Sequence, residues 1–181
     1  MPSSWAELIK DVLDAAADVS GALTSIPTEH HKIHQGLAWR AVHELDSLAS
    51  GATSKFLIRV PAGVSPHLRS YRVNSTGNPV LIRLYEGATV TVVGTTVTPR
   101  NCKRSVSDTD GVLIYTGATA TADGTLLESS RVVGDRHAGS SDDPTIEEWN
   151  LKPSTDYLIT VKNESNGSVN VILNLFWYEP S

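Results

Sequence analysis

Short runs rich in apolar and β-branched residues, several of them alternating with polar residues, recur along the chain from residue 55 onward, and this pattern is typical of antiparallel β-structure. The stretch 78–104 contains two or three such runs, rich in β-branched residues, separated by glycines and closed by Pro99. Further runs occupy 55–60, 68–73 and 112–115. No helical periodicity separates these runs. We therefore predict a mainly β fold, either an antiparallel β-sandwich or a barrel.

The last part of the chain carries the clearest alternation. Every second residue is apolar in 157–161 and again in 169–177, and the pair Asn166-Gly167 lies between these runs. An Asn-Gly pair between alternating runs is typical of a β-hairpin, so we expect the two strands to pair with each other. The final strand is long, which predicts a place inside a sheet.

The first residues follow a different pattern, that of an amphipathic α-helix over residues 5–19. Ser4 and Glu7 have capping-box spacing, and Gly21 ends the segment. The apolar positions recur every three or four residues: Trp5, Leu8, Ile9, Val12, Ala15, Ala16 and Val19. The helix either closes the end of its own sandwich or forms an arm that reaches a neighbouring subunit. We divide the chain into an N-terminal helix and linker, 1–27, and a β-sandwich domain, 28–181.

Two other regions are less regular. Residues 37–48 combine helical spacing with a strand-like start, so helix and strand both stay open. Residues 105–143 are rich in Ser, Thr, Asp, Gly and Ala, and apart from the run at 112–115 we expect a polar surface insertion. Four acidic residues lie at the end of this region and just beyond it: Asp142, Asp143, Glu147 and Glu148. We interpret them as a solvated loop rather than as catalytic carboxylates, because nothing predicts a cleft around them.

A cluster of histidines in the segment 29–36 raises the question of a metal site. On a strand His30 and His34 share a face that His31 cannot join. In a helix His30 and His34 align again, but no glutamate lies between them as in zinc proteases. We therefore predict no metal, and interpret these residues as structural histidines on a strand near a subunit contact.

Composition narrows the classes of function. The 181 residues are 40% hydrophobic, enough for one domain of ordinary size. The single cysteine, Cys102, excludes an internal disulfide and cannot by itself build a thiolate metal site. A net charge of −5 argues against nucleic acid as the main ligand, and no apolar run is long enough for a membrane span. No nucleophile lies in a recognisable motif, so we expect neither an enzyme nor a cofactor.

Four segments then carry a resemblance. In chain order they are Thr28-Glu29-His30-His31-Lys32-Ile33-His34-Gln35-Gly36, Leu84-Tyr85-Glu86-Gly87-Ala88-Thr89, Pro99-Arg100-Asn101-Cys102-Lys103-Arg104-Ser105 and Phe176-Trp177-Tyr178-Glu179. Together they resemble a family of tailed-phage virion proteins, over residues 27–181. Cys102-Lys103 departs from that pattern, where a second Asn-Arg pair is expected. The resemblance implies a jelly-roll-like sandwich that decorates the outer surface of a capsid.

This family resemblance makes a structural role the leading hypothesis. The protein would bind the major capsid protein on the outside of the virion and bridge neighbouring subunits, without chemistry of its own. Because a closed oligomer repeats one contact on a symmetric lattice, we expect self-association, as a homotrimer first and a dimer second. The expected capsid or subunit contacts are Trp5, Leu8, Ile9 and Val12 on the helix and Arg100, Lys103 and Arg104 on a turn.

Two other classes compete with it. A carbohydrate- or receptor-binding module would present Tyr71, Trp149 and Tyr178 on an exposed face of the sandwich. A metal-dependent enzyme would need two histidines and a carboxylate held around an open position, drawn from His30, His31, His34 and His137, and the spacing does not supply this arrangement.

Overall fold

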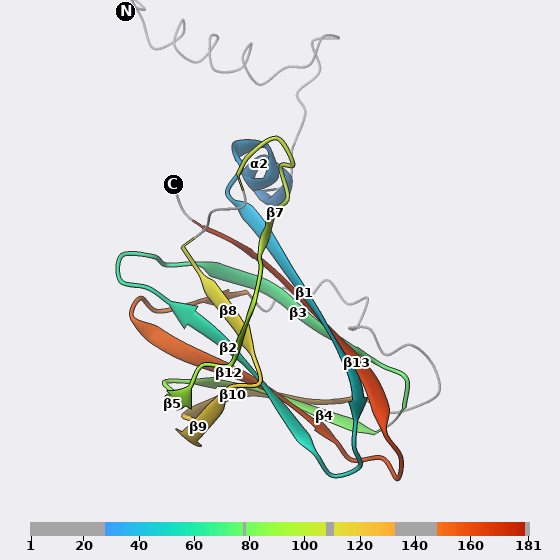
Figure 1. Cartoon of the computed structure of the whole chain (residues 1–181). Coiled ribbons are helices and arrows are strands. Elements are labelled where there is room, and N and C mark those ends of the chain that lie inside the picture. Colours follow the sequence, from blue (N-terminus) through green and yellow to red (C-terminus); the bar gives the residue numbers. More distant parts are fainter. Residues whose placement is uncertain (1–27, 78, 108–110, 133–147, 180–181) are drawn as a thin grey trace, which may run out of the picture. The chain divides into compact units, whose positions relative to one another are not determined.

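The computed structural model describes residues 28–77, 79–107, 111–132 and 148–179 (Figure 1). The chain divides into two compact units, residues 1–31 and 32–181, and only 28–31 of the first unit are described. The helix predicted at 5–19 lies outside the described residues. The fold below is that of the second unit.

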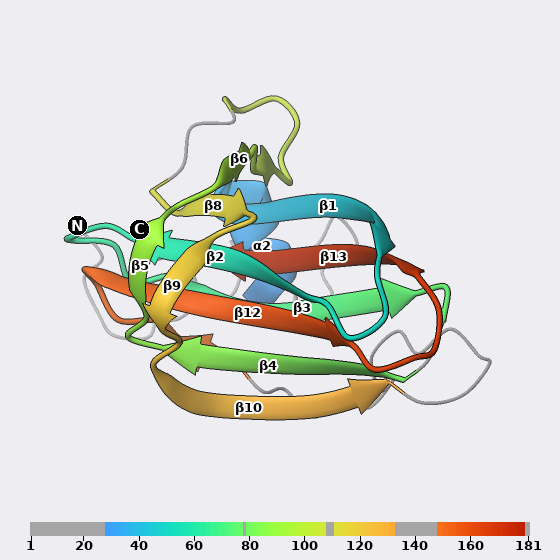
Figure 2. The ribbon, with the colours of Figure 1, turned by 60° about the horizontal axis from the view of Figure 1, so that its bottom comes forward.

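Two large antiparallel sheets and a small two-stranded one form most of this unit, so the prediction of a mainly β, sandwich-like fold is confirmed (Figures 1 and 2). One sheet has five strands in the order β11-β3-β13-β1-β7, and the other has six in the order β10-β4-β12-β2-β8-β6. The strands are β1 (Ala38–Leu48), β2 (Thr53–Val60), β3 (His67–Ser75), β4 (Val80–Glu86), β5 (Thr89–Val92), β6 (Thr95–Val97), β7 (Arg100–Asn101), β8 (Leu113–Thr116), β9 (Thr119–Ala122), β10 (Thr125–Val132), β11 (Trp149–Asn150), β12 (Thr155–Asn163) and β13 (Val169–Tyr178).

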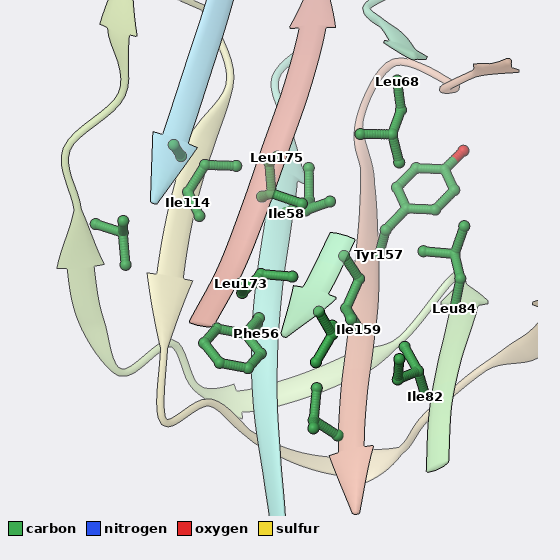
Figure 3. Close-up of a cluster of buried hydrophobic side chains, with 14 of the residues drawn as sticks. Phe56, Ile58, Leu68, Ile82, Leu84, Ile114, Tyr157, Ile159, Leu173 and Leu175 are labelled. Carbon is green, nitrogen blue, oxygen red and sulfur yellow. The ribbon is translucent and has the colours of Figure 1, made fainter. Parts of the chain in front are cut away.

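One hydrophobic core fills the space between the sheets (Figure 3). In the six-stranded sheet, Phe56, Tyr157 and Ile159 are almost fully buried. From the five-stranded sheet, Leu173 and Leu175 on β13 meet them. The alternation expected for the last two strands is thus confirmed, and β13 lies between β3 and β1 inside its sheet.

The predicted hairpin between these strands is wrong. β12 pairs with β2 and β4, whereas β13 pairs with β1 and β3, so the turn leads from one sheet to the other. Asn163 holds this corner: it is fully buried, and its side-chain amide donates to the carbonyls of Leu48 at 2.8 Å and Gly167 at 2.7 Å. The backbone amide and hydroxyl of Ser165 donate to its Oδ1 at 2.9 and 2.7 Å. These bonds fix a crossing between layers.

The polar region contains two strands that the sequence pattern did not predict, β9 and β10. β10 pairs with β4 along the edge of the six-stranded sheet, and most of its side chains are exposed. β9 pairs with β5 as a separate two-stranded ribbon, called the ribbon below. Figure 2 shows it crossing the six-stranded sheet, and its inner side covers a small second cluster centred on Leu57, Ala118 and Leu158. Backbone pairing with β4 and β5, rather than the burial of alternate apolar side chains, defines these two strands.

An internal repeat underlies the ribbon. Residues 84–97 and 114–127 share Tyr, Gly, Ala, Thr, Thr, Gly and Thr at corresponding places. The two copies exchange their last strands, because β6 pairs with β8, and β10 pairs with β4. β2 and β12 also correspond, each carrying an aromatic residue followed by Leu-Ile and a further Val. The six-stranded sheet is thus approximately symmetric about the line between β12 and β2.

The repeat also interleaves the two halves of the chain. If the chain is divided between β7 and β8, strands from the first and second half alternate across the whole six-stranded sheet. The same alternation runs through β11, β3, β13 and β1, and the ribbon takes one strand from each half. Among the described strands, only β7 pairs with a strand of its own half, at the sheet edge beside β1.

The histidine segment forms a helix, α2 (Thr28–Gln35), so its prediction as a strand is wrong. Gly36 ends the helix with φ of 77°, a left-handed conformation that glycine adopts without strain. Its amide donates to Ile33 O and the Leu37 amide to Lys32 O, both at 3.0 Å, which is the Schellman pattern of a helix C-terminus. His30 and His34 therefore lie four residues apart on a helix, and both are exposed. The next segment, left open between helix and strand, is β1.

Candidate functional site

The predicted contact residues Arg100, Lys103 and Arg104 lie together at one end of the five-stranded sheet, and are called the basic turn below. Arg100 belongs to β7, which pairs with β1 through Asn101 opposite Trp39 and Arg100 opposite Arg40 (Figure 1). Lys103 and Arg104 follow directly in the turn, and all three basic side chains are exposed. The structure therefore places the three residues together at the surface, whereas Trp5, Leu8, Ile9 and Val12 lie outside the described residues.

A buried asparagine gives the basic turn its shape. Asn101 has no solvent exposure, and its side-chain amide donates to Gly36 O at 2.7 Å. Its Oδ1 accepts the Lys103 backbone amide at 2.8 Å, while the Cys102 amide donates to Ala38 O at 2.8 Å. These bonds join the turn to the chain that links α2 and β1. Because Asn101 points inward, Arg100 before it on β7 projects to the opposite, solvent-exposed side.

The rest of the turn closes over Gly36. The Val106 amide donates to Lys103 O at 2.9 Å, and a Cβ added at Gly36 would lie 3.2 Å from the Val106 side chain. Arg104 Nη1 donates to the Asn101 carbonyl at 3.2 Å. The turn is thus held by backbone groups and by Asn101, and this framework fixes the backbone positions from which the cationic side chains extend.

The electrostatics of the turn are those of a cationic surface. Burial raises the pKa of the Cys102 thiol, against the opposing effect of Arg40 and Arg104 beside it. The thiol therefore keeps its proton at neutral pH, and cations dominate the site. Arginine and lysine groups of this kind bind carboxylates, arginine through a two-pronged fork. Exposed pairs contribute only about 0 to 1 kcal/mol each, so such a site needs several contacts or several copies.

Sequence reasoning found the basic residues but missed Asn101, which organises them. It also missed Arg40, an exposed cation placed opposite Arg100 by the β1–β7 pairing. Asn101 sits in a polar run with no alternation around it, so no pattern distinguishes it from a solvated turn residue.

A second polar cluster joins β3, β13 and the start of β11. The rings of His67 and Tyr178 stack with their centroids 4.8 Å apart and an interplanar angle of 13°. His67 Nδ1 lies 2.5 Å from Glu148 Oε1, and the Tyr178 hydroxyl donates to the same oxygen. Burial raises the pKa of Glu148, but the hydrogen bonds from Tyr178 and His67 outweigh it and the net shift is downward. Glu148 is therefore a partnered, half-buried carboxylate, and its interpretation as solvated loop is wrong.

The three aromatic residues considered for carbohydrate binding do not form an open platform. Tyr178 is only 8% exposed beneath His67. Tyr71 and Trp149 are half-buried against the main core, and the Trp149 indole donates to Glu128 Oε2 at 3.3 Å. Stacking on a sugar needs a free aromatic face, so these side chains serve packing instead.

An open hollow of about 510 Å³ lies where β2 ends and β12 begins in the six-stranded sheet, and its two charged side chains neutralise each other. Arg59 Nε and Nη2 donate to the two carboxylate oxygens of Asp156 at 2.8 and 2.7 Å. The other lining residues are Val60, Pro61, Gly87, Ala88, Leu113, Ser154 and Thr155. This hollow presents no unpaired charge to a ligand.

Tyr157 anchors a third polar cluster. Its ring is buried in the core. Its hydroxyl donates a hydrogen bond to Glu86 Oε2 at 3.0 Å and accepts one from the Lys152 backbone amide at 2.8 Å. Lys152 Nζ donates to Glu86 Oε1 at 2.7 Å, which lowers the pKa of Glu86. Burial, with Glu86 adding to it, raises the pKa of Tyr157 to about 12.

This shift predicts a loss of stability at high pH. The unfolded chain releases the Tyr157 proton near its ordinary pKa of 10.0, whereas the folded chain holds it until about 12. The contribution is therefore complete below the first value and is lost as pH rises towards the second. We expect Tyr157→Phe to lose roughly 1–3 kcal/mol at neutral pH, because Glu86 and the Lys152 amide lose a partner. Urea unfolding over the alkaline range should show a flatter decline for the variant; an identical decline in both proteins would contradict the assignment.

No group of three or more His, Cys, Asp or Glu side chains is placed to hold a metal within the described ranges. In those same ranges no helix has the length and apolar character to cross a membrane. No protein-family model matches the chain, and a comparison with curated proteins finds no match.

Proposed function

We propose that this chain is a decoration protein of a tailed-phage virion. It binds the outer surface of the capsid and stabilises the shell by bridging neighbouring subunits of the major capsid protein. The observation that carries the proposal is the basic turn, a set of exposed cations on a turn whose backbone is held by buried Asn101, in a chain whose net charge is −5. The ordered segments that resemble phage virion proteins support it, and one of them contains this turn. The proposal assigns no catalytic residue and no cofactor.

The strand order supports a jelly-roll sandwich within this proposal. Four strands of each sheet, β11-β3-β13-β1 and β10-β4-β12-β2, form two facing layers. The chain passes from one layer to the other between β1 and β2, β2 and β3, β3 and β4, and again along β10 to β13. Repeated crossing of this kind is characteristic of jelly rolls, which are common in viral capsid proteins.

Charge supports the outer surface as the place of binding. Packaged DNA repels an acidic protein, so the outside of the shell is the favourable side. The basic turn would there meet acidic groups of the major capsid protein. Each exposed pair is weak, so we expect a homo-oligomer, as a trimer or a dimer, that repeats the contact on the lattice.

The direct test compares particles prepared with and without this protein. Particles that carry it should survive heat or low salt better, and imaging should show it outside the shell. Unchanged robustness, or a location inside the shell or only on the tail, would overturn the proposal. Binding to a glycan array or to host cells without capsid binding would favour a receptor-binding module instead.

The basic turn itself gives a sharper prediction. The triple variant R100Q/K103Q/R104Q should bind capsids at least about tenfold more weakly, because loss of charge at a repeated contact multiplies across the oligomer. The effect should grow smaller as salt rises, since screening already weakens the wild-type contact. Binding is measured by co-sedimentation of the purified protein with particles that were prepared without it.

A matched control removes the same charge elsewhere. The variant R131Q/K152Q/K162Q neutralises three basic side chains that are 56%, 67% and 46% exposed, away from the turn. It should bind like the wild type. Equal loss of binding in both triple variants would show that net charge, and not the basic turn, governs docking.

A further inference from the structure

The outer face of the five-stranded sheet carries an ordered set of exposed residues on β1. Trp39 and Ala41 point into the core, so Arg40, Val42 and Glu44 project away from it, and all three are exposed. Val42, in the middle of this long strand, is 53% exposed. A cation, an apolar side chain and an anion thus follow each other on one face.

The neighbouring strand β13 extends this face with apolar and amide side chains. Arg40 lies opposite Phe176, Val42 opposite Asn174, and Glu44 opposite Ile172. The Arg40 guanidinium lies 5.1 Å from the centroid of the Phe176 ring. The three β13 residues are only half-buried, so the two strands present a continuous face with Val42 and Asn174 at its centre.

We propose that this face binds the same face of a second copy of the chain. The two copies are related by a two-fold axis that runs between their five-stranded sheets, level with Val42. Such an axis, perpendicular to β1, reverses the strand direction of the partner. Arg40 then faces the partner's Glu44, and Val42 faces its own counterpart. On β13 the same rotation sets Phe176 against the partner's Ile172. Charge and apolar surface both become complementary in a single placement.

The rest of the face is compatible with this placement. Arg72 on β3 lies opposite Asn174, about 10 Å from β1, since strands are about 4.8 Å apart. Because Arg72 is level with Val42, the same axis sets it opposite the partner's Arg72 at the exposed rim of the face. Arg72 would remain solvated there. Water and salt screen the repulsion between the two Arg72 side chains, whereas the interface shields the Arg40–Glu44 pairs from water.

The size of the face predicts a weak dimer. Three strands span about 14 Å across, with a length of about 30 Å. This is smaller than the roughly 800 Å² that each partner contributes to a standard interface. We expect dimerisation to depend on concentration, and this surface fits a dimer rather than the trimer suggested by lattice arguments alone. The proposal concerns the isolated full chain and stands whether or not that chain binds a capsid.

The test uses charge reversal and rescue in the full-length protein, followed by sedimentation velocity over a concentration series. R40E and E44R should each weaken the dimer at least about tenfold, because each places like charges together twice about the axis. The double variant R40E/E44R exchanges the charges and should restore the dimer. V92E alters a side chain that is 55% exposed on the ribbon and should leave the dimer unchanged.

Several outcomes would overturn the proposal. These are a wild-type monomer at every concentration, a dimer that ignores both single reversals, and a double variant that stays monomeric while circular dichroism shows it folded. A trimer that responds only to changes in the basic turn would also overturn it. Capsid binding by R40E/E44R is measured separately, so failure of self-association and failure of the capsid proposal are distinguishable.

Discussion

Gly124→Ala should leave little folded protein. Gly124 has φ of 97°, and a Cβ at this position would lie 2.2 Å from Glu86 O and 2.9 Å from the carbonyl carbon of Gly87. Both are backbone atoms of the paired repeat, so no side-chain rotation relieves the clash. The backbone must separate where β10 leaves the ribbon and joins β4. We expect a loss of at least about 3 kcal/mol of unfolding free energy, from strain and overpacking together. Urea unfolding and soluble yield measure it.

The repeat supplies both a second case and a control. Gly94 occupies the corresponding place, with φ of 91° and a Cβ position 2.1 Å from Thr116 O, so Gly94→Ala should be as damaging. Gly117 also has a positive φ, 73°, but nothing lies within 4 Å of its Cβ position. Gly117→Ala should therefore lose only about 1–2 kcal/mol, the ordinary strain of a left-handed residue. Similar losses at Gly117 and Gly124 would show that close backbone approach is not the cause.

The second large effect is expected at Asn163. Asn163→Ala removes a fully buried amide and leaves the Leu48 carbonyl, the Gly167 carbonyl and the Ser165 amide without this partner. Each lost bond to a buried group costs about 1 kcal/mol or more, so we expect a loss of about 3–4 kcal/mol. The midpoint of urea unfolding should fall while its slope stays constant.

An exposed neighbour in the same turn provides the comparison for Asn163. Asn166 belongs to the Asn-Gly pair and its side chain is exposed. Asn166→Ala should change the unfolding free energy by no more than about 0.5 kcal/mol. A larger effect at Asn166 than at Asn163 would mean that the turn, and not the buried amide, holds the corner between the sheets.

Alternation predicted most strands because those strands have one side in the core. On β12, Tyr157, Ile159 and Val161 share the buried face, and the odd-numbered residues of β13 do the same. Apolar alternation did not predict the strands at the periphery of the fold. β9 and β10 pair through their backbones while most of their side chains face solvent, so they carry no apolar period. The Asn-Gly turn was assigned to a hairpin because the buried contacts of Asn163 depend on residues far away in the chain.

The candidate site divides in the same way. Arg100, Lys103 and Arg104 were recognisable because charged residues after a strand are usually exposed. The position of Asn101 depends on Gly36 and Ala38, which are distant in sequence and meet it only after β7 pairs with β1. The self-association face was also invisible to pattern, since β1 was ambiguous between helix and strand. The order of Arg40, Val42 and Glu44 indicates a binding face only once β13 is known to lie beside β1.

The interleaving of the two halves sets the order of events during synthesis. When residues up to 107 have left the ribosome, almost none of their strands has its neighbour yet, and only the two-residue pairing of β1 with β7 can form. The apolar faces of β2, β3 and β4 must therefore stay exposed until the second half emerges. Chains in this condition fold late and aggregate readily, because all remaining contacts are long-range. Production of the protein should thus depend on chaperones that protect nascent chains, and translational pausing before the second half is complete would prolong the exposure of these faces.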